Sequence, residues 1–252
     1  MPEANIVTPL TPASSREFDA AYVAWKDWDA AEFGRYSPLD ARYFESEFGG
    51  STYSAARALE IGFGNGPVLA WLRDRGADVY GVETNPVLVD RAARQLGPTR
   101  IFSNLRDSSL QALAGTFTHV IALDVLEHVP LEELPSMLSR IRELLAPEGI
   151  AVLRFPNGDS PFGRLNQHGD PTHVTTLGGE RLAYFARRAG FVVLQIRAPA
   201  LPASGVGLVR GIKRRLMHFV RGLIEHAASR LYLGGRRIPF DPNYTAVLQR
   251  PR

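Results

Sequence analysis

From residue 57 onward, short apolar runs alternate with longer segments whose apolar residues recur every three or four positions. The short runs have the length of strands, and the longer segments have the period of amphipathic helices. We expect strands at 58–61, 78–83, 99–103, 118–123, 149–156, 191–198 and 244–250. We expect helices at 67–76, 86–97, 134–145 and 179–190. This alternation predicts an α/β fold built on a mainly parallel sheet.

The segment before this pattern, residues 1–55, holds 10 of the chain's 24 aromatic residues. Two interpretations of this aromatic-rich helical segment stay open. It is either a cap packed on the sheet edge or a lid that closes over a substrate, because aromatic side chains favour pockets that exclude water. The remainder, 56–252, is expected to form the main domain.

Residues 205–232 predict a basic amphipathic helix inserted before the last strand. Its apolar positions are Val209, Ile212, Leu216, Phe219, Val220, Leu223, Ala227 and Leu231, and its basic positions are Arg210, Lys213, Arg214, Arg215, Arg221 and Arg230. Three roles stay open: packing or a dimer contact, contact with a membrane surface or lipid phosphate, and binding of nucleic acid. Nucleic acid is disfavoured, because the aromatic residues gather at the opposite terminus instead of alternating with the basic ones.

Composition narrows the class of protein. The formal net charge is only +3, but residues 197–252 hold 11 basic and 2 acidic side chains, whereas residues 1–196 hold 18 and 24. A basic end on an acidic body suggests an anionic partner or a solvated helix face. The chain has no cysteine, which excludes a disulfide scaffold, and its apolar runs are too short for a membrane span. With no secretory signal recognised, we expect a cytoplasmic protein.

A glycine-rich turn, Gly62 to Gly66, follows the first core strand and precedes a helix. Glycines let the backbone approach a ligand, and the helix N-terminus offers free N–H groups. Glu83, 21 residues after Gly62, stands where a carboxylate can accept both hydroxyls of a ribose. A dinucleotide site needs a third small residue where this chain has Pro67, so the turn favours another ribose-bearing cofactor.

The segments LEIGFGNG, VYGVETNP and FTHVIALDVLEHVP resemble, in order and spacing, the motifs of class I S-adenosylmethionine-dependent methyltransferases. The resemblance covers about residues 55–198. It implies a Rossmann-like sheet of seven strands, with helices on both faces and the last strand, YTAVLQR, antiparallel. It also implies S-adenosylmethionine as cofactor and S-adenosylhomocysteine as product.

The resemblance also assigns roles to residues. Glu60 and the glycine turn would hold the amino-acid part of the cofactor, Glu83 its ribose, and the segment from Ser103 its adenine edge, with Asp107 as an alternative there. Asp124 would face the methionine end and the substrate. The cofactor-binding residues implied are Glu60, Gly62, Phe63, Gly64, Gly66, Glu83, Thr84, Asn104, Leu105, Asp124 and Val125.

The stretch DVLEHVP, 124–130, resembles a subgroup with quinone-pathway and sugar O-methyltransferases. His128 is a candidate base, or a histidine that only shapes the pocket. Some quinone-pathway members hold a divalent metal with an acid-x-x-Glu-His set. The matching residues here are Asp124, Glu127 and His128, but Asp replaces the longer Glu, and we expect no metal.

The polar segment 155–179 is longer than a connector needs and follows the fifth strand, where the family places substrate determinants. It resembles that of methyltransferases encoded with glycan assembly enzymes. Its candidate substrate-binding residues are Asn157, Asp159, Arg164, Asn166, His168, Asp170 and His173. His173 is the first choice for base or substrate ligand, ahead of His168; alternatively, Asp170 and His173 brace the loop.

These residues together predict O-methylation of a sugar or glycan by in-line transfer, with His173, His128 and Asp124 as the catalytic residues. The acceptor would be a small molecule or a lipid-linked glycan met at the inner membrane surface. One alternative is an O-methyltransferase of a quinone or other natural product. Another is a protein that binds the cofactor without turnover.

Overall fold

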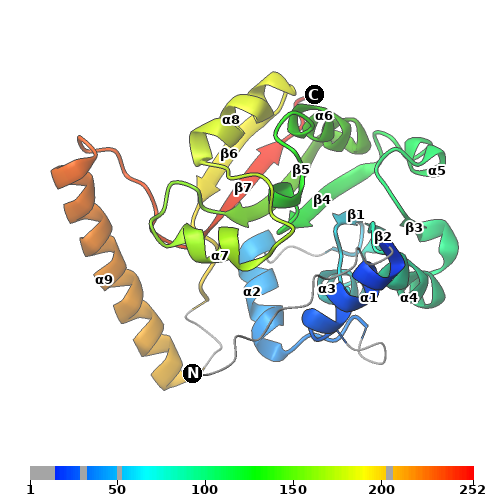
Figure 1. The fold of residues 1–252 in the computed structure, drawn as a ribbon, viewed down its shortest axis with the longest axis horizontal. Coiled ribbons are helices and arrows are strands. Elements are labelled where there is room, and N and C mark those ends of the chain that lie inside the picture. The colour runs from blue at the N-terminus through cyan, green and yellow to red at the C-terminus, as the bar shows by residue number, and fades with distance from the viewer. Residues whose placement is uncertain (1–14, 29–32, 50–52, 203–206) are drawn as a thin grey trace, which may run out of the picture.

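The computed structural model describes residues 15–28, 33–49, 53–202 and 207–252. Its centre is a seven-stranded sheet in the order β3-β2-β1-β4-β5-β7-β6 (Figure 1). The strands are β1 (Arg57–Ile61), β2 (Asp78–Val82), β3 (Ile101–Phe102), β4 (Phe117–Leu123), β5 (Leu145–Pro156), β6 (Val192–Arg197) and β7 (Asn243–Gln249). β7 pairs antiparallel with both β5 and β6, whereas the other pairings are parallel. The predicted seven-stranded Rossmann-like fold with its antiparallel last strand is confirmed.

Helices connect and cover these strands. The α-helices are α1 (Ser15–Trp25), α2 (Pro38–Phe48), α3 (Pro67–Asp74), α4 (Pro86–Leu96), α5 (Ser108–Gln111), α6 (Leu134–Leu144), α7 (Gly163–Gly169), α8 (Gly179–Arg188) and α9 (Leu208–Tyr232). Two 3-10 turns, η2 (Pro98–Arg100) and η3 (Leu126–His128), complete the described elements. Several helices begin where the sequence has start signals: Asn85 caps α4 by accepting the Val87 N–H, and Pro86 occupies its first turn.

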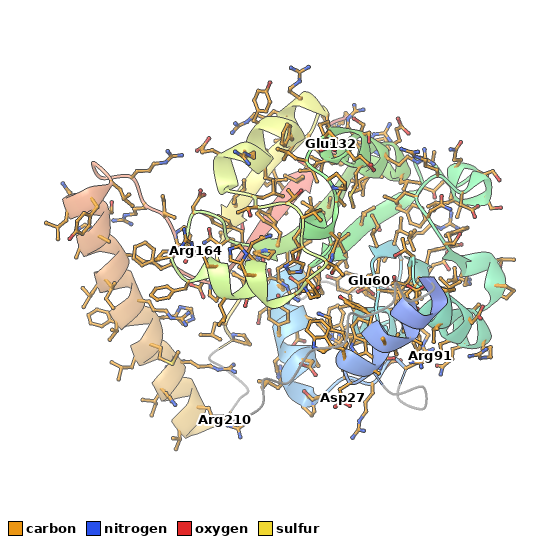
Figure 2. The ribbon with its side chains drawn as sticks, viewed as in Figure 1. Asp27, Glu60, Arg91, Glu132, Arg164 and Arg210 are labelled. Carbon is orange, nitrogen blue, oxygen red and sulfur yellow. The ribbon has the colours of Figure 1, made fainter. Side chains whose placement is uncertain are left out.

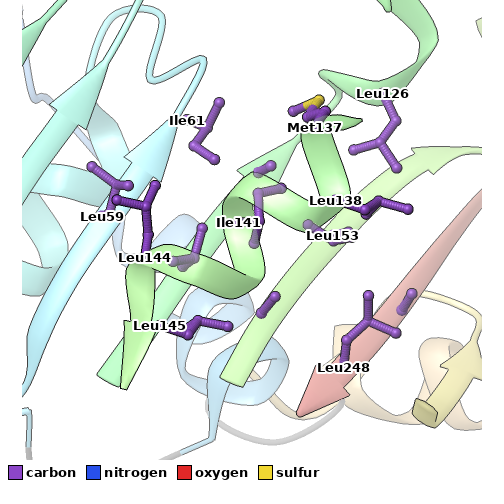
Figure 3. Close-up of a cluster of buried hydrophobic side chains, with 14 of the residues drawn as sticks. Leu59, Ile61, Leu126, Met137, Leu138, Ile141, Leu144, Leu145, Leu153 and Leu248 are labelled. Carbon is purple, nitrogen blue, oxygen red and sulfur yellow. The ribbon is translucent and has the colours of Figure 1, made fainter. Parts of the chain in front are cut away.

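Each face of the sheet carries its own hydrophobic core, because successive strand residues point to opposite sides. Leu59 and Ile61 pack with the α6 and α8 side chains on one face (Figure 3), whereas Ala58 packs with α2, α3 and α4 on the other. α6 meets its core with a fully buried stripe of Leu134, Leu138, Ile141 and Leu144. Burial on both faces explains why the central strands read as continuous apolar runs.

The strand expected at 149–156 begins earlier, at Leu145. Two further predictions need correction. The strand expected at 99–103 contracts to β3, because Pro98 to Arg100 form η2 and Arg100 turns back to bind Asp78 and the Val79 carbonyl. The polar segment expected as a loop at 155–179 contains a short helix, α7, whose packing against β5 outweighs its turn-rich composition. Neither change alters the order of the strands.

The sheet topology determines where a ligand fits. β1 lies between β2 and β4. The strands that follow it in sequence first extend to one side of β1, as β2 and β3, and then to its other side, from β4 onward. In parallel sheets the crevice at such a switch point, beyond the carboxyl ends of the strands, is where ligands bind. The segments that follow β1, β2, β4 and β5 all reach this edge, and helix α1 crosses it (Figure 1).

The predicted basic helix is α9, which stands beside the sheet and covers neither of its faces (Figure 1). Among the described residues, no helix combines the length and the hydrophobicity that a membrane span requires. The predicted helical nature of the N-terminal segment agrees with α1 and α2, while its residues 1–14, 29–32 and 50–52 lie outside the described ones.

Candidate active site

A cavity of about 750 Å³ opens at the carboxyl edge of the sheet. Its floor comes from the ends of β1, β4 and β5, and its walls come from the N-terminal segment and the region around α7. Nine of the residues predicted for the site line it: Glu60, Gly62, Phe63, Gly64, Asp124, His128, Asn166, Asp170 and His173. The sequence motifs therefore converge on one space, although they are far apart along the chain.

The glycine turn is shaped for close approach of a ligand. Gly62 has φ +67°, and a Cβ there would come 2.5 Å from a methyl group of Val125. Gly64 has φ +54°, and a Cβ there would meet the Trp28 ring at 2.9 Å. Both positions therefore need glycine, because a side chain would be strained and would also clash. Gly66 is the N-cap residue of α3 and lies against the Phe33 ring. It is not among the residues that line the cavity.

Glu60 is a buried acid whose oxygen Oε2 has no hydrogen-bond partner. Burial raises its pKa well above the ordinary value, with a further push from the charge of Glu83, although a backbone hydrogen bond from Leu69 lowers it. Such a carboxyl group fits a cationic ligand group. An ammonium beside the glycine turn would supply a positive charge and the hydrogen-bond donor that Oε2 lacks. The amino-acid part of S-adenosylmethionine carries such an ammonium.

Glu83 lies behind the glycine turn, outside the residues that line the cavity. Its Oε2 accepts the Gly64 N–H at 3.0 Å, and its Oε1 accepts the N–H groups of Thr84 and Asn85 at 2.8 and 3.0 Å. These bonds fix the carboxylate against the glycine turn. Because each carboxylate oxygen has two acceptor positions, Glu83 keeps capacity to bind ribose hydroxyls. Thr84 contributes its backbone here, and its side chain is exposed.

Arg154 is a cation at the floor of the cavity. Its guanidinium donates to both carboxylate oxygens of Asp124 and to the Tyr43 hydroxyl. Asp124 has φ +57°, and its N–H bonds the Arg154 carbonyl at 2.9 Å, so backbone and side chains reinforce the pair. The Arg154 pKa is raised: burial lowers it, but the charge of Asp124 outweighs that effect. With both oxygens engaged, Asp124 is poorly placed to remove a proton.

His128 is held in one tautomer. The Thr172 hydroxyl donates its single proton to Asp170, so the 2.9 Å contact between Thr172 Oγ1 and His128 Nδ1 requires the imidazole to donate. Its Nε2 is then left as a free acceptor. Burial lowers the His128 pKa, and so does the neighbouring His173. His128 is therefore neutral near pH 7 and able to take a proton.

His173 lies against His128, with ring centroids 4.6 Å apart in an edge-to-face arrangement. Its Nδ1 lies 3.1 Å from the Gln167 carbonyl, which can only accept, and its Nε2 lies 3.9 Å from Asp170 Oδ2. The backbone clamps the two rings together, because the Glu127 carbonyl accepts the N–H groups of Val174 and Thr175. The cavity thus contains two adjacent imidazoles, and neither Nε2 atom makes a hydrogen bond within the part of the chain that the structure describes.

Glu127 lies beneath this pair with both carboxyl oxygens buried and unpartnered. Burial raises its pKa to about 8, with a second contribution from the charge of Asp124. Its Oε1 is 3.8 Å from His173 Nε2. At neutral pH this carboxyl group therefore carries its proton, which keeps a second negative charge away from the floor of the cavity.

The N-terminal segment reaches across to the same cluster. Lys26 forms an ion pair with Asp170 at 2.9 Å, and the Tyr22 hydroxyl donates to the same carboxylate at 3.1 Å. Asp170 is buried, and its pKa is lowered: burial raises it, but the bonds from Thr172 and Lys26 outweigh that effect. A charged Asp170 in turn orients Thr172 and through it His128. The N-terminal segment thus contributes directly to the wall of the cavity.

The segment predicted to contact adenine lies outside the cavity lining. Asn104 accepts the Arg106 N–H in a local turn, Leu105 packs on the core, and Asp107 caps α5. Val125 also lies behind the lining, against Gly62. These side chains are engaged in shaping the backbone, and their contact with a cofactor stays a prediction.

Four residues predicted to bind substrate also lie away from the cavity lining. The Asn157 amide is fully buried and donates to the carbonyls of Pro239 and Asp241, so it ties β5 to the entry of β7. Asp159 accepts the Gly179 N–H and the Tyr244 hydroxyl. Arg164 (labelled in Figure 2) and His168 are exposed on α7. Of the 155–179 residues, Asn166, Asp170 and His173 are among those that line the cavity.

The acid-x-x-Glu-His set does not assemble, because Asp124 is turned to Arg154. Within the described ranges, the acidic and histidine side chains whose donor atoms gather within 4.8 Å are Glu127, His128 and His173. One ligand atom from each of these three side chains could hold a metal ion, so the expectation of no metal stays a prediction.

Sequence reasoning missed Arg154, Tyr43, Lys26 and Thr172. One signal was available: Arg154 is a charged residue within the apolar run 149–156, and an unpaired charge is rarely buried in a strand. Lys26 had no such signal, because its partner Asp170 is more than 140 residues away.

Comparison with known proteins identifies the family of this chain. A model of the methyltransferase domain family matches residues 29–196. The chain is 29% identical to a ubiquinone biosynthesis O-methyltransferase of Cereibacter sphaeroides over 59% of this chain and 65% of that protein. It is 26% identical to a human tRNA N(3)-cytidine methyltransferase over 62% and 47%, respectively. The matched part thus spans less than two thirds of either relative.

The fold is similar to that of a solved S-adenosylmethionine-dependent methyltransferase from Archaeoglobus fulgidus, with a TM-score of 0.57 and 19% identity over 94% of this chain and 95% of that one. The family match covers well over half of the chain, including the glycine turn, Glu83 and both cavity histidines. The chain therefore belongs to the methyltransferase domain family, in the class I S-adenosylmethionine-dependent group.

Proposed function

We propose that this protein transfers the methyl group of S-adenosylmethionine to a hydroxyl oxygen of its acceptor. One observation carries the choice of oxygen: two adjacent imidazoles in the cavity beside the glycine turn have their Nδ1 atoms engaged, which leaves each Nε2 available to a ligand. A hydroxyl is a weak nucleophile until a base takes its proton. Family membership alone does not decide the atom, because the relatives compared above are named for oxygen and for nitrogen acceptors.

The cofactor would be held by Glu60 at its ammonium, by the glycine turn along its backbone, and by Glu83 at its ribose. When bound, it supplies a methyl group activated by a sulfonium centre. The chain's own contribution is then to align the acceptor oxygen in line with that methyl and to exclude water, which is the role of the aromatic wall from Tyr22 to Trp28.

His128 is our choice for the base. The acceptor oxygen forms a bond to the methyl carbon as the carbon–sulfur bond breaks, and the hydroxyl proton passes to His128 Nε2. The resulting imidazolium is stabilised by the hydrogen bond from Nδ1 to Thr172 and by the charged Asp170 behind it. His173 stands edge-on to His128, and its own Nε2 accepts from a neighbouring hydroxyl of the acceptor and so orients it.

We propose a sugar or glycan as the acceptor. The cavity combines aromatic rings with many hydrogen-bonding side chains, among them Lys26, Arg35, Asp40, Asn166 and Asn243. Aromatic faces with surrounding polar groups suit a polyhydroxylated ring. A phenolic acceptor of a quinone pathway is the second candidate, and it is favoured by the Cereibacter sphaeroides relative.

The test is a turnover assay with S-adenosylmethionine, in which S-adenosylhomocysteine is quantified and the mass of the acceptor product is determined by mass spectrometry. One panel holds nucleotide sugars and oligosaccharides, and the other holds catechols and polyprenylated phenols. Methylation confined to the first panel supports the proposal, whereas methylation confined to the second replaces its acceptor. Saturable S-adenosylhomocysteine binding with no turnover on either panel would point to the third hypothesis, a protein that binds the cofactor without turnover.

A further inference from the structure

α9 turns its apolar side away from the rest of the protein. Ile212, Leu216, Phe219 and Leu223 lie on one face of the helix by their spacing, and all are exposed, with Leu216 at 61% and Phe219 at 64%. None of the described α9 residues belongs to either hydrophobic core. A face of this size rarely stays uncovered on a monomeric protein, because contiguous exposed apolar area marks an interaction site.

The opposite, polar side of α9 holds the helix to the body. Arg221 forms an ion pair with Asp241 at 2.7 Å, and Glu225 accepts the Phe240 N–H at 2.8 Å. Arg214 donates to the Pro202 carbonyl at 2.5 Å. These contacts fix the orientation of the helix, so the outward direction of its apolar face is set by specific bonds on its inner face.

Cationic residues surround and interrupt the apolar face. The helix carries six basic side chains and one acidic one, Glu225, which is already bound on the inner side. By helical spacing, Lys213 and Arg230 lie within the apolar face, and Arg210 and Arg215 lie at its borders. Figure 2 shows Arg210 at one end of α9. The surface that covers this face must therefore accept apolar side chains and at least four positive charges together.

We propose that α9 docks on an anionic membrane surface, with its apolar face at the headgroup–acyl boundary. An amphipathic helix with a cationic border binds such a surface by combining apolar burial with attraction to acidic headgroups. A second copy of the chain fits less well, because a symmetric contact through this face would bring Lys213 and Arg230 against further cations. Lys and Arg in the face can instead extend to the phosphates while their stems stay in apolar contact.

A chain of contacts links this surface to the mouth of the cavity. Phe240, held by Glu225, makes an edge-to-face contact with Phe162, whose ring is 60% exposed. Leu165, on the following turn of α7, is 80% exposed and lines the cavity. These contacts connect α9 to the cavity wall, and under the proposed function an acceptor on a lipid carrier would suit a protein docked through α9.

The experiment is sedimentation of the full chain with vesicles of phosphatidylcholine alone or with equal parts phosphatidylglycerol. We expect binding to the anionic vesicles only, weakened in 0.5 M salt because screening removes the headgroup attraction. Neutralising Arg210, Lys213 and Arg215 to Gln should weaken binding at least about tenfold, since each cation near the surface contributes roughly fivefold. The double variant Leu216→Glu/Leu223→Glu should abolish sedimentation, since it removes two apolar contacts and adds two negative charges.

The matched control is Leu131→Glu/Leu194→Glu, which makes the same change at two exposed leucines outside α9 and should bind like the wild type. Light scattering without vesicles measures the oligomeric state and so tests the alternative that a second copy of the chain covers α9. A dimer that Leu216→Glu/Leu223→Glu converts to a monomer, with no vesicle binding by the wild type, would overturn the proposal in favour of a second copy. Equal binding to neutral and anionic vesicles, or no loss in the α9 variants, would also overturn it.

Discussion

The two halves of the cavity are built in different ways. The cofactor half comes from short continuous segments: the glycine turn follows β1 directly, and Glu83 reaches back to Gly64 across 19 residues. The acceptor half joins distant segments, because Asp170 binds Tyr22 across 148 residues and Thr172 binds His128 across 44. A site made from local segments can be read from motifs, whereas a site made by tertiary packing depends on how the whole chain folds. The same division predicts that substitutions in one half should leave the function of the other half intact.

The largest effect is expected from His128→Asn. The Asn amide can keep the hydrogen bond to Thr172 that Nδ1 makes, while Nε2 is removed. We expect turnover to fall by about 10²–10⁴, the usual contribution of a positioned base. S-adenosylhomocysteine affinity should stay within twofold of the wild type, by calorimetric titration.

His168→Asn is the matched control, because this histidine is exposed on α7 and does not line the cavity. Its turnover should equal that of the wild type. A loss of turnover in His168→Asn with full activity in His128→Asn would identify His168 as the base in place of His128.

His173→Asn should raise the KM for the acceptor more than it lowers kcat.

The converse substitution is Glu83→Ala, in the cofactor half. Loss of a carboxylate that binds two hydroxyls should weaken S-adenosylhomocysteine binding about thirty- to a hundredfold, or ~2–3 kcal/mol. At saturating S-adenosylmethionine, kcat should approach the wild-type value. Glu148→Ala, which removes an exposed partner of Arg252, controls for loss of a carboxylate elsewhere. Unchanged S-adenosylhomocysteine affinity in Glu83→Ala would show that this half is assembled differently from the motif.

A third prediction concerns stability, since Glu127 is a buried acid with a pKa of about 8 in the folded protein. Between pH 4.5 and 8 the folded chain keeps a proton that the unfolded chain releases, so wild-type stability falls as pH rises through this range. Glu127→Gln removes that dependence. The variant should therefore gain stability relative to the wild type on going from pH 5.5 to 8.5, by about 3 kcal/mol or roughly 9 °C in Tm.

Calorimetry at the two pH values measures this difference. The control is Glu132→Gln, since Glu132 is exposed and its replacement should shift both Tm values alike. An equal Tm difference at both pH values for Glu127→Gln would mean that Glu127 is ionised in the folded protein. The negative charge would then face His173 directly.

The contrast between the two halves also explains what the sequence could predict. The strand order follows from apolar runs that alternate with amphipathic helices, whereas the length of β3 was misjudged because Pro98 and Arg100 prefer a local turn. In the segment 155–179, composition identified a functional region but could not separate Asp170 and His173 from Asn157 and Asp159. All four are polar residues in turns, and only packing shows that the latter two brace the backbone.

The smallest effect is expected from Lys26→Met, which removes the ion pair between the N-terminal segment and the segment 155–179. Asp170 keeps its bonds to Thr172 and Tyr22, so His128 stays oriented and kcat should change little. The N-terminal wall of the cavity loses one of its attachments, however, and the KM for the acceptor should rise about fivefold, in line with ~1 kcal/mol for a partly exposed pair. Arg252→Met, which breaks the exposed pair with Glu148, should leave KM unchanged. If Lys26→Met instead lowered kcat as strongly as His128→Asn, the charge of Lys26 would itself be part of the proton path, and the acceptor half would extend into the N-terminal segment.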